Sequence, residues 1–426
     1  MNNITRRSFL TAVAAGAVVT ATGCNKKTST PAPATPAVKR IVVLGAGFGG
    51  STAAKYLKML DPTLDVTLVD RSAAHTSCPL SNEVIFGLRD ISFITLPHKP
   101  FADRYGIRFV QAEVMGLDAS KKIVRTSEGE ISYDKLIVSP GIGMDYDVAN
   151  GFDSEMQKAI PHAWIAGEQT IWLRDMIKNV KKGSTLLLRT PKTIYRCPPG
   201  PYERASLMAD FAKKSGCKVT VIDPNPGIVS KAPRFQAGFD ELYSDVLTYI
   251  PSAGVKSYDK GRNTIVTEKG EFTADLINFI PDQRAGDMAF LLGLIPEGKK
   301  WAPVNPITFE SDLIKDVHVI GDAIDPAITD TPKSGVIANT TAKLVAETIV
   351  REFAGQEPLL PMMGNSCYSL VSPHEGIYIA TVYHYDPTVK RIVVKNGTNG
   401  VSPERSEENY LNLNSWAENV LFDSFK

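Results

Sequence analysis

A glycine-rich turn between an apolar strand and a helix constrains the fold of this chain more than any other feature. Residues 39–44 (KRIVVL) read as a buried parallel strand, and Gly45, Gly47 and Gly50 follow it with the spacing GxGxxG. The first glycine permits a tight turn, the second leaves room for a pyrophosphate, and the third lets helix and strand pack closely. The N-terminus of the helix then faces the phosphates. The pattern predicts a Rossmann-like domain that binds a dinucleotide.

An acidic residue ends the next predicted strand, residues 65–69. This residue, Asp70, lies about twenty residues past the last glycine, where a carboxylate binds the ribose hydroxyls of the dinucleotide. A negative charge at this position also disfavours a 2′-phosphate. Asp70 is therefore predicted to bind the cofactor.

Two later segments indicate FAD rather than NAD as the bound dinucleotide. Residues 133–141 (YDKLIVSPG) and 317–323 (VHVIGDA) resemble the strands and turns of flavoproteins with two dinucleotide-binding domains. That resemblance implies that Asp322 contacts the ribityl chain of the flavin. Lys333 precedes a predicted helix, and a cation beside a helix N-terminus can stabilise a negatively charged reduced flavin. An ordinary capped loop is the alternative for Lys333.

A second Rossmann-like unit lacks its glycine motif. Residues 184–189 and 218–223 read as strands, with a helix over 201–214 between them. The turn before this helix, residues 191–200, reads PKTIYRCPPG, and its bulky side chains occupy the space that glycines would leave for a pyrophosphate. We therefore expect no NAD(P)H to bind here. The turn instead carries Cys197 where the pyridine nucleotide would lie.

Several segments resemble one family, the flavoprotein subunit of flavocytochrome c sulfide dehydrogenase, in the FAD-dependent pyridine nucleotide-disulfide oxidoreductase-like superfamily. The most specific is CPPGPYERAS, residues 197–206. The resemblance covers residues 38–426. The other matching segments are 75–84 (HTSCPLSNEV), 161–164 (PHAW), 166–170 (AGEQT), 332–335 (PKSG) and 366–369 (SCYS).

The fold class implied is α/β, with two Rossmann-like dinucleotide-binding domains and a C-terminal α+β interface domain. The second Rossmann-like domain lacks its glycine motif. The FAD-binding domain is expected in two parts, separated in the sequence by the second domain. The predicted divisions are a signal peptide at 1–24, a linker at 25–38, FAD-binding parts at 39–152 and 275–353, the second domain at 153–274, and the interface domain at 354–426.

The resemblance also implies roles for individual residues. Cys78 corresponds to the cysteine that is joined covalently to the flavin 8α carbon, although Pro79 departs from the family pattern. Cys197 and Cys367 correspond to a redox-active disulfide, and Glu203 to a proton acceptor. The alternatives are a small buried residue for Cys78, a purely structural disulfide, and a solvated or ion-paired helix position for Glu203. Cys217 precedes an apolar strand and is expected only to pack there.

These roles imply the oxidation of sulfide to sulfur or polysulfide. Hydrosulfide would attack the disulfide and give a persulfide and a thiolate. Arg196 and the start of the helix after Cys197 are expected to stabilise a thiolate at Cys197. Electrons would pass through the flavin to a haem on a partner c-type cytochrome, since the chain has no CxxCH motif.

Three other functions stay open. A sulfide:quinone oxidoreductase would have the same fold. An accessory flavoprotein of thiosulfate or sulfur oxidation would have little activity alone. A lipoprotein or binding module would use FAD only structurally. No metal site is predicted, and the net charge of +1 gives no reason to expect nucleic acid as a partner.

The N-terminus predicts export. The pair Arg6–Arg7 precedes an uncharged stretch at residues 10–23, which is typical of a twin-arginine signal. Cys24 ends a segment that resembles a lipoprotein box, but the same segment also suits ordinary cleavage. The predicted location is the periplasm or the outer face of the cytoplasmic membrane. Lipid at Cys24 is the one membrane attachment expected.

Overall fold

The first sheet has the predicted dinucleotide-binding topology. The computed structural model describes residues 38–426. Five parallel strands pair in the order β19-β9-β1-β2-β5. Both faces of such a sheet are covered, which explains why its strands are continuous apolar runs. The bounds are β1 Arg40–Leu44, β2 Asp65–Asp70, β5 Arg108–Gln111, β9 Lys135–Val138 and β19 Val317–Val319. The twin-arginine pair, Cys24 and residues 25–37 of the linker lie outside the described residues.

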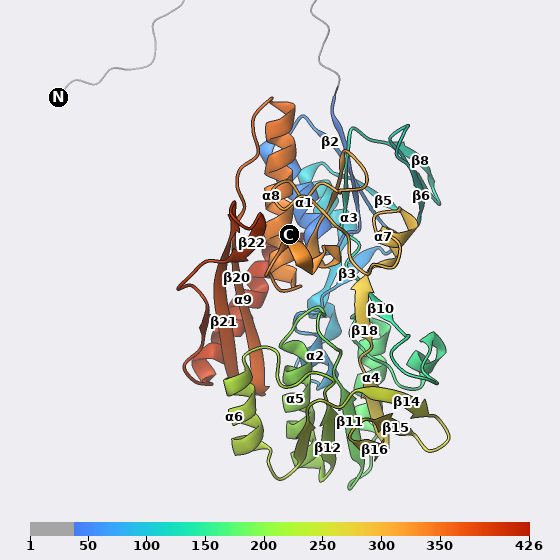
Figure 1. Ribbon diagram of the computed structural model, residues 1–426, viewed down its shortest axis with the longest axis vertical. Helices are drawn as coiled ribbons and strands as arrows, with labels where there is room; N and C mark the ends of the chain where they lie inside the picture. The colour runs from blue at the N-terminus through green and yellow to red at the C-terminus, as the bar shows by residue number, and fades with distance from the viewer. Residues whose placement is uncertain (1–37) are drawn as a thin grey trace, which may run out of the picture. The chain divides into compact units, whose positions relative to one another are not determined.

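Two helices lie side by side against this sheet (Figure 1). α1 (Phe48–Leu60) leaves the glycine turn directly, and α8 (Gly335–Phe353) packs along it. Ala53 and Ala54 of α1 are fully buried, and these small side chains permit the close approach. The hydroxyl of Ser334 caps α8 by accepting the N–H of Ile337. The cap fixes the start of α8 beside the end of β19.

The second sheet has four parallel strands in the order β13-β12-β11-β17. The helix α5 (Gly200–Ser215) connects β11 to β12, as the sequence predicted. This sheet and α5 form the lower part of the molecule in Figure 1. The strand bounds are β11 Thr185–Arg189, β12 Lys218–Ile222, β13 Leu247–Ile250 and β17 Leu276–Phe279.

The C-terminal region is an antiparallel sheet covered by one helix. Strands β20 (Met362–Ser372), β21 (Glu375–Asp386) and β22 (Arg391–Val394) pair in sequence order, and β23 (Gly400–Val401) adds to β21. The helix α9 (Glu407–Phe425) packs on β20 and β21. The predicted fold class, two Rossmann-like units and a C-terminal α+β region, is confirmed.

Smaller elements connect these parts. The helices are α2 Ser81–Ile85, α3 His98–Tyr105, α4 Glu168–Lys178, α6 Ala232–Leu242 and α7 Asp287–Leu291, with short 3-10 turns at Ile91–Ile94, Ser154–Lys158, Gly321–Ala323 and Pro326–Ile328. The strands are β3 Ala74–Thr76, β4 Thr95–Pro97, β6 Val114–Asp118, β7 Ile123–Thr126, β8 Gly129–Ser132, β10 Ile142–Asp145, β14 Val255–Asp259, β15 Thr264–Thr267, β16 Gly270–Thr273 and β18 Asp282–Ala285.

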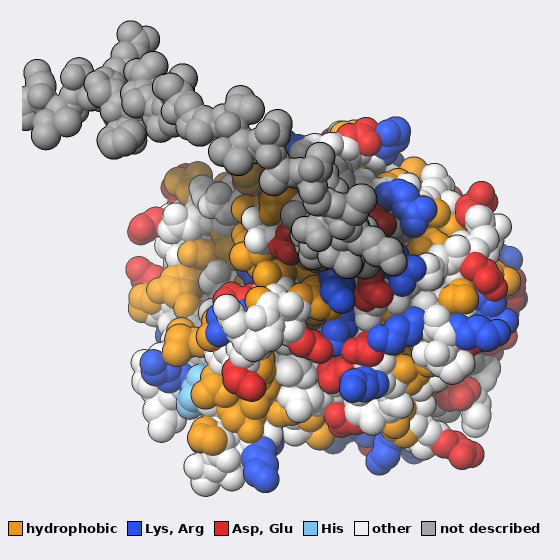
Figure 2. All heavy atoms as spheres, turned by 90° about the horizontal axis from the view of Figure 1, so that it is seen from above, with side chains coloured by type: hydrophobic (Ala, Val, Ile, Leu, Met, Phe, Trp, Pro, Cys, Tyr) orange, Lys and Arg blue, Asp and Glu red, His pale blue; other side chains and the backbone are white. Residues whose placement is uncertain are grey.

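The surface agrees with the near-zero net charge. Acidic and basic side chains are interspersed on the face seen in Figure 2, and hydrophobic ones gather mainly on its left side. Within residues 38–426, no helix is both long enough and apolar enough to cross a membrane.

Candidate flavin and disulfide site

The glycine turn has the shape that a pyrophosphate requires. Gly45 has a φ of 89°, and a Cβ there would lie 2.3 Å from the carbonyl oxygen of Ser139. A Cβ on Gly50 would lie 1.7 Å from the carbonyl oxygen of Gly45. A Cβ added to Gly47, by contrast, would meet only the ring of His75, at 3.6 Å. Space is therefore left beside Gly47, at the N-terminus of α1, where phosphates bind.

Asp70 lies at this turn, as predicted. One of its carboxylate oxygens accepts the N–H of Ala46 at 2.7 Å, and the other accepts the N–H of Ser72 at 2.8 Å. The two backbone donors fix the orientation of the carboxylate. Each oxygen keeps a further lone pair, so the group can still accept from ribose hydroxyls. Ribose binding by Asp70 stays a prediction.

Asp322 and Lys333 lie together at the end of β19. The Lys333 ammonium donates to the carbonyl oxygens of Asp322 and Ile324, both at 2.7 Å, and burial lowers its pKa to about 8. Oδ1 of Asp322 is buried without a partner among the described residues, and burial raises the pKa of this carboxyl. A buried acceptor without a donor fits a hydroxyl of the ribityl chain. The residues at this site therefore fit FAD.

The structure brings Cys197 and Cys367 into one cluster, although they come from different domains. Cys197 lies in the turn before α5 with a φ of 58°, and Cys367 lies within β20. The two thiols are close enough that the charge of Cys367 contributes to the pKa of Cys197. A Cβ at residue 200 would lie 2.9 Å from Sγ of Cys197, so Gly200 is required beside the sulfur. Both thiols are free in the structure, and their pairing as a disulfide stays a prediction.

The expectation of a stabilised thiolate at Cys197 is wrong for this dithiol form. Burial is the largest influence and raises the pKa of Cys197 far above its ordinary value, and the charge of Cys367 adds to the rise. Arg196 acts in the opposite direction, but its effect is smaller. Its guanidinium also donates to the carbonyl oxygen of Trp164.

The main chain of Cys197 is tied to the flavin-binding side. Its N–H donates to the carbonyl oxygen of Lys333 at 2.8 Å, where the two segments form a short parallel bridge. The cysteine turn of the second domain therefore lies next to the loop that leads into α8. This contact brings the predicted redox and cofactor residues together.

Glu203 lies in the first turn of α5 and faces the protein interior. Oε1 accepts from the side-chain amide of Asn82 at 2.9 Å, and Oε2 accepts the N–H of Leu370 at 3.1 Å. Burial raises the pKa of Glu203. No ion pair involves Glu203 among residues 38–426. Glu203 is therefore not ion-paired within the described part of the chain, and its role as a proton acceptor stays a prediction.

Cys78 lies just before α2, close to the same cluster. Its thiol donates to the carbonyl oxygen of Trp164 at 3.4 Å, the same oxygen that accepts from Arg196. Cys78 is partly exposed, which differs from a sealed core residue. Cys217, in contrast, is buried and donates to the carbonyl oxygen of Lys181, as expected for a packed thiol.

Arg204 is a central residue of the site whose role the sequence did not indicate, although it lies within the segment 197–206. It is fully buried, and its guanidinium donates to the carbonyl oxygens of His162 (2.6 Å) and Ala163 (2.7 Å). It also donates to the side chains of Asn82 (2.9 Å) and Asn278 (3.0 Å). Arg204 thus holds the 161–164 loop, whose Trp164 contacts Cys78.

Lys231 is a second residue that the sequence did not indicate. Its ammonium is buried, donates to the hydroxyl of Ser369 at 2.9 Å, and lies 3.8 Å from Sγ of Cys367. It precedes α6, and nothing in its local sequence signals a buried charge. The approach of Lys231 to the cysteine depends entirely on tertiary packing.

The acid at the end of β12 has no free oxygen to offer a nucleotide. Asp223 corresponds in position to the ribose-binding acid of a Rossmann unit. Oδ2 accepts from the hydroxyls of Tyr202 and Tyr249, both at 2.8 Å, and Oδ1 accepts from Asn225. These contacts agree with the prediction that the second unit does not bind NAD(P)H.

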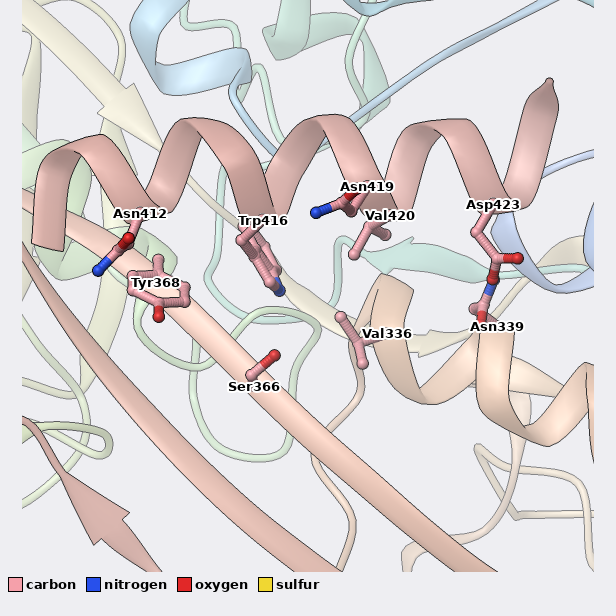
Figure 3. Close-up of a pocket in the computed structure, with 9 residues that line it drawn as sticks. All are labelled: Val336, Asn339, Ser366, Tyr368, Asn412, Trp416, Asn419, Val420 and Asp423. Atoms are coloured by element: carbon pink, nitrogen blue, oxygen red, sulfur yellow. The ribbon is translucent and has the colours of Figure 1, made fainter.

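A separate pocket lies between α9 and β20. It has a volume of about 510 Å³, and Figure 3 shows polar side chains around it together with Trp416. Ser366 and Tyr368 of β20 line this pocket. Because successive side chains of a strand alternate in direction, Cys367 points to the opposite face. The other lining residues are Val336, Asn339, Asn412, Asn419, Val420 and Asp423.

Three family models match this chain, and together they define its class. Residues 39–166 match a model described as pyridine nucleotide-disulphide oxidoreductase. Residues 170–281 match the central region of the sulfide dehydrogenase [flavocytochrome c] flavoprotein chain, and residues 360–425 match the flavin-binding region of flavocytochrome c sulphide dehydrogenase. The protein is thus an FAD-binding flavoprotein of the pyridine nucleotide-disulphide oxidoreductase type.

Individual relatives narrow this class. The flavoprotein chain of sulfide dehydrogenase [flavocytochrome c] from Chlorobaculum thiosulfatiphilum is 56% identical over 46 residues, which cover 11% of this chain and 96% of that sequence. The chain belongs to the family of flavocytochrome c sulfide dehydrogenase flavoprotein chains.

More distant relatives cover most of the chain. A type II NADH:quinone oxidoreductase of Staphylococcus haemolyticus is 30% identical over 379 residues, 83% of this chain and 92% of the relative. The solved sulfide:quinone oxidoreductase of Aquifex aeolicus matches the fold with a TM-score of 0.73 at 19% identity, covering 91% of each chain. That structural match supports the fold alone.

Proposed function

We propose that the protein is an FAD-dependent sulfide dehydrogenase that passes electrons to a c-type cytochrome subunit. Sulfide would be oxidised to sulfur or polysulfide through a disulfide between Cys197 and Cys367. The observation that carries the proposal is the cluster of these two cysteines with Glu203, against the loop that holds Lys333. The family match supports sulfide as the substrate and a cytochrome as the partner.

The residues of the cluster suit this chemistry. Hydrosulfide is a nucleophile, and a disulfide sulfur is the electrophile that it attacks. Burial raises the pKa of Glu203, which favours proton uptake by this carboxylate, the property that a proton acceptor needs. FAD, when bound, supplies a group that accepts an electron pair and releases the electrons singly. Cys197, Cys367 and Cys78 are each partly exposed residues.

Covalent attachment of the flavin through Cys78 is part of the proposal. The thiol is held by the carbonyl oxygen of Trp164 at the edge of the cysteine cluster, which orients it without sealing it. Pro79 follows this thiol, and its carbonyl oxygen accepts from the hydroxyl of Ser77. Export by the twin-arginine pathway to the periplasm is also proposed, on the basis of Arg6 and Arg7.

A comparison of two cysteine variants tests the central claim. In wild-type protein, sulfide should bleach the flavin anaerobically and support the reduction of cytochrome c. Cys367→Ala should abolish both reactions in folded, flavin-loaded protein. Cys217→Ala is the matched control, because this thiol is buried away from the cluster. Near-normal sulfide-dependent cytochrome reduction by Cys367→Ala would overturn the catalytic role of the disulfide.

Quinone is a second candidate acceptor, and one observation favours it. The pocket between α9 and β20 is about 510 Å³ and contains the indole of Trp416, whose buried Nε1 has no partner among the described residues. This N–H could donate to a quinone carbonyl. Purified protein that reduces a soluble ubiquinone analogue faster than cytochrome c would favour this function. An accessory flavoprotein would reduce neither without a further partner.

A further inference from the structure

Lys231 is a buried amine with no ion-pair partner in the described part of the chain; burial lowers its pKa, and the charges of Cys367 and Glu203 act to raise it. Its side chain is 3% exposed, and no carboxylate lies within ion-pair distance among residues 38–426. The two described atoms that meet the ammonium are Oγ of Ser369 at 2.9 Å and Sγ of Cys367 at 3.8 Å. A buried charge is costly unless an opposite charge or several hydrogen bonds compensate it.

The position of Lys231 affects the pKa of the two cysteine thiols to different degrees. Burial raises the pKa of both thiols, but Lys231 is the largest influence that lowers the pKa of Cys367. For Cys197 the charge of Cys367 adds to the effect of burial, and Lys231 ranks below both. A thiolate is therefore better stabilised at Cys367 than at Cys197. In thiol–disulfide exchange, the sulfur with the lower pKa is the better leaving group.

We propose that Lys231 and Ser369 form an anion site that makes Cys367 the leaving thiolate and directs hydrosulfide to Cys197. The inference rests on the proposed disulfide chemistry and adds its direction. Hydrosulfide attacks Sγ of Cys197, and a new S–S bond forms as the bond between the cysteines breaks. The electron pair of the broken bond stays on Sγ of Cys367 beside the ammonium.

The step balances in atoms and charge. One negative charge enters as HS⁻ and remains as the Cys367 thiolate, while the proton stays on the terminal sulfur of the Cys197 persulfide. The sulfide sulfur is oxidised, and the sulfur of Cys367 is reduced. Glu203 is near enough for its charge to influence Cys197, and its carboxylate can take the persulfide proton afterwards. The anion formed in this step supplies the counter-charge that Lys231 lacks.

Mass spectrometry after a single turnover tests the direction. Flavin-loaded protein with its disulfide intact is mixed anaerobically with one equivalent of sulfide, quenched with an alkylating reagent and digested. In wild-type protein we expect the extra sulfur on Cys197 and a plain alkylated thiol at Cys367. A persulfide mainly on Cys367 would overturn the inference. Persulfide on neither cysteine would overturn the proposed function itself, and this inference with it.

Two variants of Lys231 test the source of the preference. Lys231→Met should slow the reaction with sulfide roughly 30-fold, about 2 kcal/mol for one lost charge-assisted contact, and reduce the preference for Cys197. Lys231→Arg keeps the charge and should retain most of the preference. Wild-type rate and distribution in Lys231→Met would refute the role of the ammonium. If Lys231→Met does not fold, the wild-type labelling pattern still decides the direction of attack.

Discussion

Replacement of Arg204 by methionine should destabilise the loop at residues 161–164, which lies beside the cofactor site. The guanidinium makes four hydrogen bonds of 2.6–3.0 Å, and its carbon atom lies 5.1 Å from the centroid of the Trp164 ring. Methionine fills part of the volume but donates no hydrogen bond. The carbonyl oxygen of Ala163 and the amide oxygens of Asn82 and Asn278 then lose this donor inside the protein.

The magnitude follows from these contacts. Removing one partner from a buried charged network costs about 3–5 kcal/mol. Part of this loss is offset because removing the guanidinium also removes the cost of burying its charge, the same burial that lowers the pKa of Arg204 to about 9. We therefore expect a loss of about 3 kcal/mol, at the lower end of the range. At roughly 2 °C per kcal/mol, Tm falls by about 6 °C.

Two assays separate local from global damage. Thermal unfolding gives the change in Tm, and acid precipitation gives the fraction of flavin that stays with the polypeptide. Arg204 holds the loop that carries Trp164, whose carbonyl oxygen orients Cys78, so covalent flavin should decrease as well. Arg204→Lys is the matched control, because it keeps the charge but cannot make the planar fork. Wild-type Tm and complete flavin retention in Arg204→Met would refute the reasoning.

Three further predictions concern the cofactor and proton transfer. Burial raises the pKa of Glu203, so the fraction of ionised Glu203 increases as pH rises through that raised value, and the rate of sulfide oxidation should increase with it. Glu203→Gln should remove this acid limb of the pH–rate profile and lower kcat about 100-fold. Cys78→Ser should release the flavin on acid precipitation, whereas loss of all flavin from wild-type protein would contradict covalent attachment. NADH at micromolar levels should not bleach the flavin rapidly, because Asp223 is occupied by Tyr202 and Tyr249; rapid anaerobic bleaching would contradict this.

The sequence predicted those features that depend on local patterns. The glycine turn, Asp70 and the strand before Asp322 each lie within a short segment whose spacing reflects a backbone requirement. The structure bears out the turn geometry at Gly45 and Gly50 and the position of Asp70 beside it. The absence of a glycine motif before α5 likewise predicted a Rossmann-like unit that does not bind NAD(P)H.

Features that depend on long-range packing could not be predicted in this way. Lys231 and Cys367 are far apart in the chain, and their contact requires α6 and the C-terminal sheet to meet. The prediction of a stabilised thiolate at Cys197 fails for the same reason. Arg196 and a helix start are visible in the sequence, whereas the burial that outweighs them is not.

The second Rossmann-like unit shows how the same frame can position sulfur instead of a nucleotide. The turn before α5 normally brings a backbone close to phosphates, and here it brings Cys197 to the loop of Lys333. The helix that follows supplies Glu203 and Arg204 one turn further on, facing inward from α5. A cysteine and prolines in such a turn put side chains where glycines would leave room for a pyrophosphate, which is why we expect no NAD(P)H to bind there. The expected absence of nicotinamide binding and the proposed sulfur chemistry therefore both depend on the same short segment, residues 191–200.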